Sequence, residues 1–308
     1  MSIYQQFCSL LGEAHVLQGE PLSRHTTFRV GGPADYFLSP SSEAELFEVL
    51  NLCSREKIPW FVLGNGSNML VSDKGYRGAV IQLFRNWQEV QVAGNMIFAL
   101  SGALLARVAS AARDASLTGM EFAGGIPGTI GGAVMMNAGA YGGEMKDILV
   151  QVTAMTPHGE VRNYRADELD LGYRTSRFAR SGEIVLSARM RLAKGDASRI
   201  QEEMTRLSQE RSAKQPLDLP SAGSTFKRPD GYFAGKLIMD AGLRGYRIGD
   251  AQVSEKHCGF VVNTGNASAQ DIYLLIRHIQ DTVMEKSGVM LEPEVRMLGE
   301  FGGSSCAF

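Results

Sequence analysis

The sequence predicts a mixed α+β protein of more than one domain, and three observations support this fold class. Helix-like and strand-like segments alternate in the first third of the chain. An apolar stretch at 124–143 then interrupts the pattern, with eight glycines in twenty residues. The last part of the chain, about 90 residues, returns to a compact α+β pattern long enough for its own core. The 308 residues are enough for two or three domains.

The first element with a clear signal is a helix over residues 42–57. Ser42 and Glu45 have the spacing of a capping box, in which each side chain bonds the backbone N–H of the other residue. Apolar residues recur at helical spacing on one face, at Leu46, Val49, Leu50 and Cys53. Pro59 ends the helix, and the apolar run 60–63 predicts a short buried strand.

The remaining elements follow in order along the chain. Strands are predicted at 78–84, 95–100, 147–155 and 183–192. An Ala-rich helix is predicted at 103–115, and a charged helix that could bridge two domains at 196–213. The C-terminal pattern predicts a helix at 233–241, a strand at 259–263, a helix at 268–286 and a strand at 295–298. The glycine-rich stretch is too apolar for a flexible linker and too rich in glycine for a helix.

The composition is that of an ordinary globular protein without a strong overall charge. Hydrophobic residues make up 44% and charged residues 21%, and the formal net charge is -2. We therefore expect no nucleic-acid partner and no attraction to an anionic membrane. The N-terminus lacks the pattern of a signal peptide, and no apolar run reaches the ~18 residues of a membrane helix. These features predict a cytoplasmic protein.

The cysteines and histidines indicate neither a disulfide framework nor a metal site. The four cysteines are scattered without a CxxC pair and are expected to be reduced thiols: Cys8, Cys53, Cys258 and Cys306. The five histidines show no HxxxH or HExxH spacing, so no metal is expected.

Two glycine loops are the strongest functional signal in the residues themselves. The loop at 63–68 follows the predicted strand at 60–63, and a second loop lies at 124–132. Glycines allow positive φ angles and a close approach of the backbone, and successive N–H groups form an anion nest. One such loop alone would be taken as a packing turn, but two favour a diphosphate ligand. The candidate binding residues are Leu63, Gly64, Asn65, Gly66, Ser67, Asn68, Gly125, Ile126, Gly128, Thr129, Gly131 and Gly132.

The two most common nucleotide-binding motifs are absent from the sequence. It contains no GxxxxGK[ST], which excludes a P-loop NTPase, and no GxGxxG after a strand, which argues against a Rossmann fold. Spacing alone therefore indicates a cofactor that contains a diphosphate and leaves its type open.

Several segments resemble a known family. Residues 62–70 and 125–133 resemble the phosphate loops of the vanillyl-alcohol-oxidase/PCMH-type FAD-binding fold. Four more segments together resemble the UDP-N-acetylenolpyruvoylglucosamine reductases: His25–Gly32, Gly172–Phe178, Ala222–Lys227 and Leu291–Val295. The resemblance runs from about Leu22 to Gly299. The short stretch between Phe178 and Glu183 is similar to the type II form, which leaves little room for a tyrosine-bearing loop that the longer form has.

The resemblance implies a domain organisation and a set of ligands. Two subdomains, 1–78 and 79–200, would flank non-covalent FAD, and an α+β domain at 201–301 would bind the substrate, followed by a flexible tail at 302–308. NADPH would be the co-substrate and a UDP-sugar the substrate. We expect a monomer.

The implied reaction reduces an enolpyruvyl ether to a lactyl ether, which requires stabilisation of an enolate and one proton donor. By resemblance, Arg174 stabilises the enolate, since a guanidinium can grip a carboxylate with two hydrogen bonds. Without the resemblance, Arg174 would be one surface residue in an arginine-rich run. Ser224 is the implied proton donor, helped by nearby cations, although its sequence context alone fits an ordinary loop hydroxyl. Glu294 is the implied carboxylate near the enolate, and Glu292 is the neighbour most easily mistaken for it.

The remaining site assignments are weaker. Tyr173 is a candidate to bond the substrate. Four basic residues are candidates for the UDP diphosphate: Lys214, Lys227, Arg228 and Lys236. His257 lies in a segment that also resembles the family, but a lone histidine is more often structural, so it has no part in the predicted mechanism.

Three other functions are compatible with parts of this pattern. An oxidase of alcohols or sugars with the same FAD fold would use oxygen and would not need Arg174, Ser224 and Glu294 together. A sensor that binds FAD or a UDP-sugar without catalysis would have a damaged acid–base set. A structural scaffold would have little use for paired glycine loops.

Overall fold

The computed structural model describes residues 1–302 and 304–306, and the chain divides into two compact units. The first unit is built from three segments, residues 1–18, 36–65 and 79–211. The second unit is built from residues 19–35, residues 66–78 and the chain from 212 onward. Each unit is therefore assembled from segments that lie far apart in the sequence. The division into parts 1–78, 79–200 and 201–301 stays a prediction.

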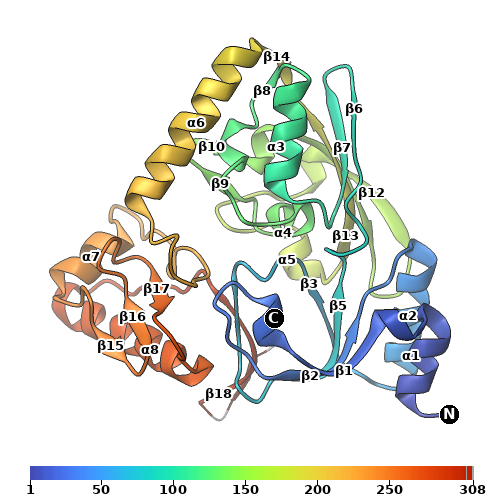
Figure 1. Cartoon of the computed structure of the whole chain (residues 1–308), viewed down its shortest axis with the longest axis horizontal. Helices are drawn as coiled ribbons and strands as arrows, with labels where there is room; N and C mark the ends of the chain where they lie inside the picture. Colours follow the sequence, from blue (N-terminus) through green and yellow to red (C-terminus); the bar gives the residue numbers. More distant parts are fainter. Residues whose placement is uncertain (303, 307–308) are drawn as a thin grey trace. The chain divides into compact units, whose positions relative to one another are not determined.

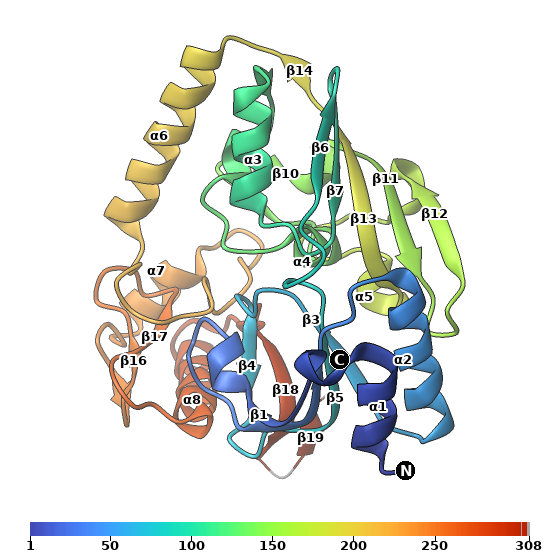
Figure 2. The same cartoon turned by 45° about the vertical axis from the view of Figure 1, so that its right-hand side comes forward.

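A five-stranded antiparallel sheet lies in the first unit, in the order β12-β11-β13-β7-β6 (Figure 2). The strands are β6 (Val90–Ala93), β7 (Met96–Leu100), β11 (Leu149–Met155), β12 (Val161–Arg165) and β13 (Ile184–Arg191). Ile97, Ala99 and Ala188 are buried on the face of the sheet that meets the core. This alternation is typical of a sheet whose strands have one face against packed helices.

Two helices pack on that face of the sheet. They are α3 (Leu105–Asp114) and α4 (Ile130–Met135). The buried side of α3 has the i, i+3, i+4 spacing of an amphipathic helix, at Leu105, Val108, Ala109 and Ala112. Both views show α3 running beside the β6–β7 hairpin (Figures 1 and 2).

Helix α4 corrects the prediction that the glycine-rich stretch is too rich in glycine for a helix. Thr129 caps its N-terminus, because the Thr129 Oγ1 accepts the N–H of Gly132 at 3.4 Å. Ile130 and Val134 are fully buried in the core of the first unit. Burial of this apolar side offsets the low helix propensity of glycine, about 1 kcal/mol for each residue.

Helices α1 (Ile3–Leu11) and α2 (Glu43–Arg55) lie side by side in the first unit and share a second core with β3 (Trp60–Leu63) (Figure 2). Ser42 is the N-cap of α2, and its side chain accepts the N–H of Glu45 at 3.1 Å. The capping box also predicts that the Glu45 carboxylate accepts the N–H of Ser42. This part of the prediction is wrong, because the carboxylate accepts the N–H and the hydroxyl of Ser41 instead.

A four-stranded sheet has the order β1-β2-β5-β3. Its strands are β1 (Val16–Pro21), β2 (Pro33–Leu38), β3 and β5 (Tyr76–Gln82), with β3 and β5 parallel. Three of the five boundaries between the two units fall within β1, within β2 and within β5. The chain therefore changes unit inside regular strands.

Short elements complete the two units, and of these only η2 lies in the second unit. The two-residue strands pair as β8 (Leu117–Thr118) with β14 (Ala193–Lys194), and as β9 (Gly139–Ala140) with β10 (Gly143–Glu144). Single helical turns are η1 (Glu13–His15), η2 (Leu22–His25), η3 (Glu121–Ala123), η4 (Met145–Asp147), η5 (Ala166–Glu168) and α5 (Phe178–Ser181). Helix α6 (Ala197–Lys214) runs into the second unit at its C-terminal end.

The second unit packs two helices and a small antiparallel sheet around one core. The sheet has the order β15-β16-β17. Its elements are α7 (Ala234–Asp240), β15 (Arg247–Ile248), β16 (Ala251–Val253), β17 (Val261–Asn263) and α8 (Ala269–Ser287). Leu275, Ile276 and Ile279 of α8 are fully buried in this core together with Val253 and Val261.

A second small sheet in the same unit has the order β19-β18-β4. Its strands are β4 (Met69–Val71), β18 (Arg296–Phe301) and β19 (Ser304–Cys306). Strand β4 is parallel to β18, and β19 is antiparallel to it. The tail predicted as flexible, 302–308, lies partly outside the described residues, and its described part includes β19.

The predicted helices and strands are confirmed in type, and none of their ends is displaced by more than three residues. Residues 60–63 form the predicted strand without any shift. The elements that the sequence analysis did not identify are short or lie at the N-terminus, and they include α1, β1, β2, β4, β15 and β16. A three-residue strand carries too few positions to show a period of two.

Helix α8 receives an additional cap from a distant loop. Besides its own Ser268 and Asp271 capping box, the Asp73 carboxylate accepts the N–H of Ala269 at 2.8 Å and of Gln270 at 2.9 Å. We predict that Asp73→Ala lowers the free energy of unfolding by about 0.5–2 kcal/mol, as for the loss of an N-cap. Urea unfolding would measure this. The adjacent Lys74→Ala removes only an exposed pair with Glu300, so a Lys74→Ala effect as large as that of Asp73→Ala would contradict the prediction.

Candidate active site

The two glycine loops meet inside the first unit. The first loop leaves β3 at Gly64, where a Cβ would lie 2.7 Å from Oγ1 of Thr129 in the second loop. The side-chain amide of Asn65 donates to the carbonyl oxygen of Pro127 at 2.6 Å. Only glycine fits at position 64, because any side chain would push the two loops apart.

The second loop is held against the segment that follows β7. Leu105 donates to the carbonyl of Gly128 at 3.0 Å, and Gly131 donates to the carbonyl of Ser101 at 2.8 Å. A Cβ at Gly131 would lie 3.1 Å from the Cβ of Ser101. Ile126 is half-buried against the core, while Gly125 and Gly132 are exposed. The loop thus has a fixed backbone and presents glycines to solvent.

The remaining part of the first loop belongs to the second unit. Gly66 has φ +62°, and a Cβ there would lie 2.0 Å from the carbonyl oxygen of His25. The side-chain amide of Asn68 donates to the carbonyl of Glu294 at 3.0 Å. The carbonyl of Asn68 accepts the N–H of Arg296 at 3.0 Å. Ser67 is half-buried between them. This half of the loop therefore fixes the backbone on both sides of Val295.

The chemistry of both loops suits a dinucleotide cofactor with a diphosphate. A Cβ would be crowded at Gly64 and Gly66 of the first loop and at Gly131 of the second, and glycines without side chains leave backbone N–H groups as the donors that a phosphate would meet. A buried hydroxyl also lies at the base of each loop, and neither has a hydrogen-bond partner within residues 1–302 and 304–306: Ser101 beside Gly131, and Thr27 beside Gly66. Unpaired buried polar atoms are uncommon and are often explained by an absent ligand or water.

Arg211 is a residue of this region that sequence reasoning missed. Its side chain packs on the second loop, since a Cβ at Gly125 would lie 3.1 Å from its Cδ. Burial lowers the pKa of Arg211, while nearby Tyr141 acts in the opposite direction. The guanidinium stays charged, because the pKa of arginine is far above neutral pH. It offers a cation to an anionic group at the glycine loop.

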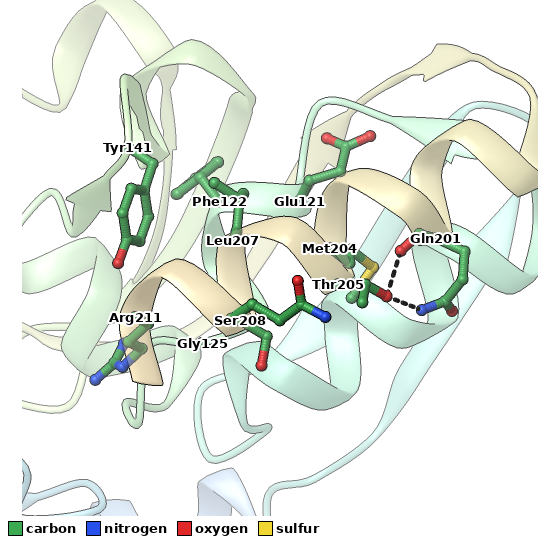
Figure 3. Close-up of a pocket in the computed structure, with 12 residues that line it drawn as sticks. Glu121, Phe122, Gly125, Tyr141, Gln201, Met204, Thr205, Leu207, Ser208 and Arg211 are labelled. Carbon is green, nitrogen blue, oxygen red and sulfur yellow. Dashed lines mark hydrogen bonds between the residues drawn. The ribbon is translucent and has the colours of Figure 1, made fainter. Parts of the chain in front are cut away.

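Arg211 lines a cavity of about 300 Å³ between α6 and the second loop. Figure 3 shows Arg211 and Tyr141 at one end of this cavity, and Gln201 with Met204 at the other. Arg211 lies near the end of a long charged helix, and nothing in the local sequence indicates that this helix returns to the glycine loop.

Arg174 lies in a tight turn of the first unit. Gly172 and Thr175 exchange two backbone hydrogen bonds, of 3.1 and 3.3 Å, so that Tyr173 and Arg174 occupy the two central positions. Arg174 has φ +55°, a left-handed conformation that costs a residue with a side chain on the order of 1 kcal/mol or more. Its Nη2 donates to the carbonyl of Gly139 at 3.3 Å, and its guanidinium lies 5.1 Å from the ring centroid of Tyr173. Strain of this kind is concentrated at functional positions.

Ser224 and Glu294 are brought onto neighbouring backbone segments of the second unit. Between them lies Thr225, which is fully buried and whose carbonyl accepts the N–H of Glu294 at 2.8 Å. The N–H of Thr225 donates to Gly259 at 2.8 Å, and its hydroxyl accepts the N–H of Val261 at 2.9 Å. Ser224 is exposed and Glu294 is half-buried. A fully buried threonine, held by two backbone hydrogen bonds and one to its hydroxyl, therefore fixes the spacing between the predicted acid and the predicted carboxylate.

The four basic candidates for the diphosphate have different surroundings. Lys227 forms an ion pair with the carboxylate of Glu292. Glu294, in contrast, lies on the segment whose backbone bonds Thr225. The guanidinium of Arg228 lies 4.0 Å from the ring centroid of Phe233. Lys236 pairs with Asp240 on the surface of α7 at 2.7 Å. Lys214 is exposed at the last residue of α6.

His257 is a structural residue in this geometry. Its Nδ1 accepts the N–H of Gly259 at 3.1 Å, and its ring packs edge-on against Phe260. Burial lowers the pKa of His257 below its usual 6.5. The neutral ring supports the Gly259 loop, whose carbonyl in turn holds Thr225.

Comparisons with known proteins agree with this geometry. A family model described as "FAD binding domain" matches residues 34–165, and the model of the C-terminal domain of UDP-N-acetylenolpyruvoylglucosamine reductase matches residues 215–298. The reductase of Agathobacter rectalis is 54% identical over 305 residues, which are 94% of this chain and 96% of that protein. The reductase of Alkaliphilus metalliredigens is 48% identical and covers 97% of this chain and 98% of its own length. The chain belongs to the UDP-N-acetylenolpyruvoylglucosamine reductase family.

A solved structure extends this similarity to three dimensions. The crystal structure of UDP-N-acetylenolpyruvylglucosamine reductase from Thermus caldophilus matches with a TM-score of 0.80 at 36% identity, over 91% of this chain and 98% of that one. The predicted family, the FAD-binding fold with its C-terminal α+β domain, and FAD as the cofactor are therefore confirmed. In this reductase only α5 and the following Gly182 and Glu183 separate Arg177 from β13, so no tyrosine-bearing loop is inserted there.

Two further findings concern other classes of partner. None of the helices in residues 1–302 and 304–306 combines the length and apolar composition needed to cross a bilayer. Within that same part of the reductase, no group of three or more His, Cys, Asp or Glu side chains could hold a metal ion.

The first glycine loop provides a test of cofactor binding. We predict that Gly66→Ala yields reductase with little or no FAD, because the added Cβ would lie 2.0 Å from the His25 carbonyl oxygen and displace the loop. Gly94→Ala is the matched control, since Gly94 has nearly the same φ, +63°, but nothing within 4 Å of a Cβ. The ratio of flavin to protein absorbance in purified samples would measure the difference. Equal FAD content in the two variants would contradict the prediction.

The pKa of His257 predicts a pH dependence of stability. Below pH ~6.5 the unfolded chain binds a proton on this histidine more readily than the folded protein does, so the stabilisation present above that pH is lost as the pH falls through the lower folded pKa. His257→Asn, whose Oδ1 can still accept the Gly259 N–H, should flatten this loss in urea unfolding between about pH 7 and pH 5. The exposed His158→Asn is the control, and a slope that changes in both variants or in neither would argue against this account.

Proposed function

We propose that this reductase converts the enolpyruvyl ether of UDP-N-acetylglucosamine enolpyruvate to the lactyl ether of UDP-N-acetylmuramate, a peptidoglycan precursor, with NADPH as electron donor. The family membership supports the overall reaction. The observation that carries the residue-level proposal is the pairing of the Thr225 segment with Glu294, which places a hydroxyl and a carboxylate on adjacent backbone positions. We propose that FAD lies on the two glycine loops and on parts 1–78 and 79–200, and that part 201–301 binds the substrate.

The reaction requires two tasks from the side chains. When bound and reduced by NADPH, the flavin would supply the hydride that adds to the terminal alkene carbon. Negative charge then develops on the neighbouring carbon and spreads into its carboxylate. We propose that Arg174 binds this carboxylate, because a guanidinium stabilises the developing enolate as a charged donor. The strained turn supports this role, since its two backbone bonds fix Arg174 before the substrate arrives.

We propose that Ser224 donates the proton that completes the reduction. Its O–H bond breaks as a C–H bond forms at the carbon next to the carboxylate, and solvent then reprotonates the alkoxide. A serine hydroxyl is a weak acid, so nearby groups must stabilise the charge that it acquires. We propose that Glu294 orients the hydroxyl of Ser224 and takes part in the same hydrogen-bond network around the enolate. A positioned acid contributes about 10²–10⁴ in rate.

The proposed roles of the other polar residues follow from their surroundings. We propose that Tyr173, which is 54% exposed, bonds the substrate beside Arg174. Lys214, Lys227, Arg228 and Lys236 are proposed to meet the UDP diphosphate. Lys227 and Lys236 would have to exchange their pairing with Glu292 and Asp240 for the phosphate oxygens. NADP dependence and a role in cell shape and division are part of the same proposal.

The cellular context is also a proposal. The free thiols of Cys8, Cys53 and Cys258 are compatible with a reducing compartment, so we propose that the enzyme acts in the cytoplasm. The net charge of -2 gives no support for a nucleic-acid partner. We propose that the active form is a monomer.

An anaerobic absorbance experiment tests the proposed reaction. NADPH should bleach the flavin spectrum of the purified reductase, and the enolpyruvyl UDP-sugar should restore it without oxygen. Restoration only on admission of air would instead indicate an oxidase or a different acceptor. A protein that neither contains nor takes up FAD would overturn the proposal.

Variants in the same experiment test the residue roles. Ser224→Ala should leave bleaching by NADPH intact and slow restoration by the substrate by about 10²-fold or more, since only the second half of the cycle needs the proton. Glu294→Gln should slow restoration more than Glu292→Gln, because Glu292 is engaged by Lys227 at the surface. If Glu292→Gln were the slower variant, the assignment of the carboxylate would be wrong.

A further inference from the structure

Asn137 is a buried polar residue that the proposed mechanism does not use. It follows the C-terminal end of α4, is fully buried and has φ +41°. Its side-chain amide donates to Glu144 Oε2 at 2.6 Å and to the carbonyl of Gly172 at 3.0 Å. Its Oδ1 accepts the N–H of Lys146 at 2.9 Å. Both amide hydrogens and the oxygen are thus satisfied inside the protein.

These bonds connect Asn137 to the two parts of the backbone that hold Arg174, which are its own turn and the β9–β10 hairpin. Gly172 is the first residue of the turn that carries Arg174, and its carbonyl also closes that turn by accepting the N–H of Thr175. The guanidinium of Arg174 donates to Gly139, which pairs with Glu144 in the β9–β10 hairpin. Asn137 bonds the Glu144 side chain as well. One buried amide therefore holds both the base of the turn and the hairpin that receives the guanidinium.

We propose that Asn137 is a positioning residue that fixes the orientation of Arg174 for enolate stabilisation. The proposal rests on the function proposed above for Arg174. Asn137 acts through the Gly172 carbonyl and the hairpin.

A purely structural role for Asn137 would have a different signature. Asparagine is favoured after a helix in the left-handed region, where glycine is favoured even more strongly. Asn137→Gly therefore keeps the backbone conformation and removes only the side-chain bonds. If Asn137 served only to end α4, Asn137→Gly would behave like the unaltered enzyme.

The test is a single-turnover measurement on the FAD-loaded enzyme. The flavin is reduced with stoichiometric NADPH in the absence of oxygen and then mixed with the enolpyruvyl UDP-sugar. Asn137→Gly should slow flavin reoxidation by the substrate by about 10- to 100-fold, as for a misplaced catalytic group. The rate of flavin reduction by NADPH and the substrate Kd should stay within about twofold. Slowing of both half-reactions to the same extent would overturn the proposal.

A double-mutant cycle identifies the route of the effect. If Asn137 acts through Arg174, adding Asn137→Gly to Arg174→Ala should change the reoxidation rate by less than about twofold. Multiplicative losses would overturn the proposal. If Arg174→Ala alone had no defect, the proposed function of Arg174 would fail. If Arg174→Ala were slow and Asn137→Gly normal, only the positioning role would fail.

A second substitution and a control complete the design. Asn137→Asp keeps the acceptor for Lys146 but loses the donor to Gly172, and it tests the same prediction should Asn137→Gly fail to retain FAD. Unchanged reoxidation in Asn137→Asp would then overturn the proposal. The control is Asn86→Ala, which removes amide bonds to the carbonyls of Ser39 and Pro40 elsewhere in the first unit. Asn86→Ala should reoxidise at the normal rate, and a matching defect there would mean that the loss is not specific to Asn137.

Discussion

The parallel pairing of β4 with β18 is the constraint on which the second unit depends. Both strands begin where a functional loop ends, β4 after the first glycine loop and β18 after Glu294. Asn68 closes this junction by bonding the carbonyl of Glu294, while Arg296 bonds back to Asn68. A shift of register between these strands would move the glycine loop and the carboxylate together. The first glycine loop and Glu294, which we propose to serve cofactor binding and proton transfer, therefore share one structural support.

Buried polar residues play the same role at other points of the site. Thr225 spaces Ser224 from Glu294, and its hydroxyl accepts the N–H of Val261. Asn137 holds the turn of Arg174, and its amide is bonded to the backbone and to the carboxylate of Glu144. A buried polar side chain that is fully hydrogen-bonded is held in one orientation, because each bond left unmade costs about 1–3 kcal/mol. The proposed reacting groups can therefore lie on loops, since the buried groups behind them fix the backbone that carries them.

The sequence predicts those parts of the fold that have a local cause. The helix at 42–57 and the strand at 60–63 follow from hydrophobic period, a cap and a proline, and both are present. The glycine loops could be identified from spacing, and the family could be identified from six short segments. Glu45 shows the limit of such patterns. Its carboxylate accepts two hydrogen bonds from Ser41 and not the one from Ser42 that the capping box predicts. Arg211 and the pairing of Lys227 with Glu292 depend on contacts between distant segments, and neither has a signal in the neighbouring residues.

Arg174 has a left-handed backbone, as do other residues with side chains such as Lys57 and Ser116. Glycine would adopt this φ without strain, so stability alone favours the loss of the side chain at this site. We propose that the role of Arg174 at the enolate is what keeps an arginine there. In a lineage where the reaction was no longer needed, residue 174 would be among the first to drift, and it would drift toward glycine or asparagine before the core changed. On the proposed role of Arg174, the identity of this one residue would distinguish an active reductase from an inactive descendant with the same fold.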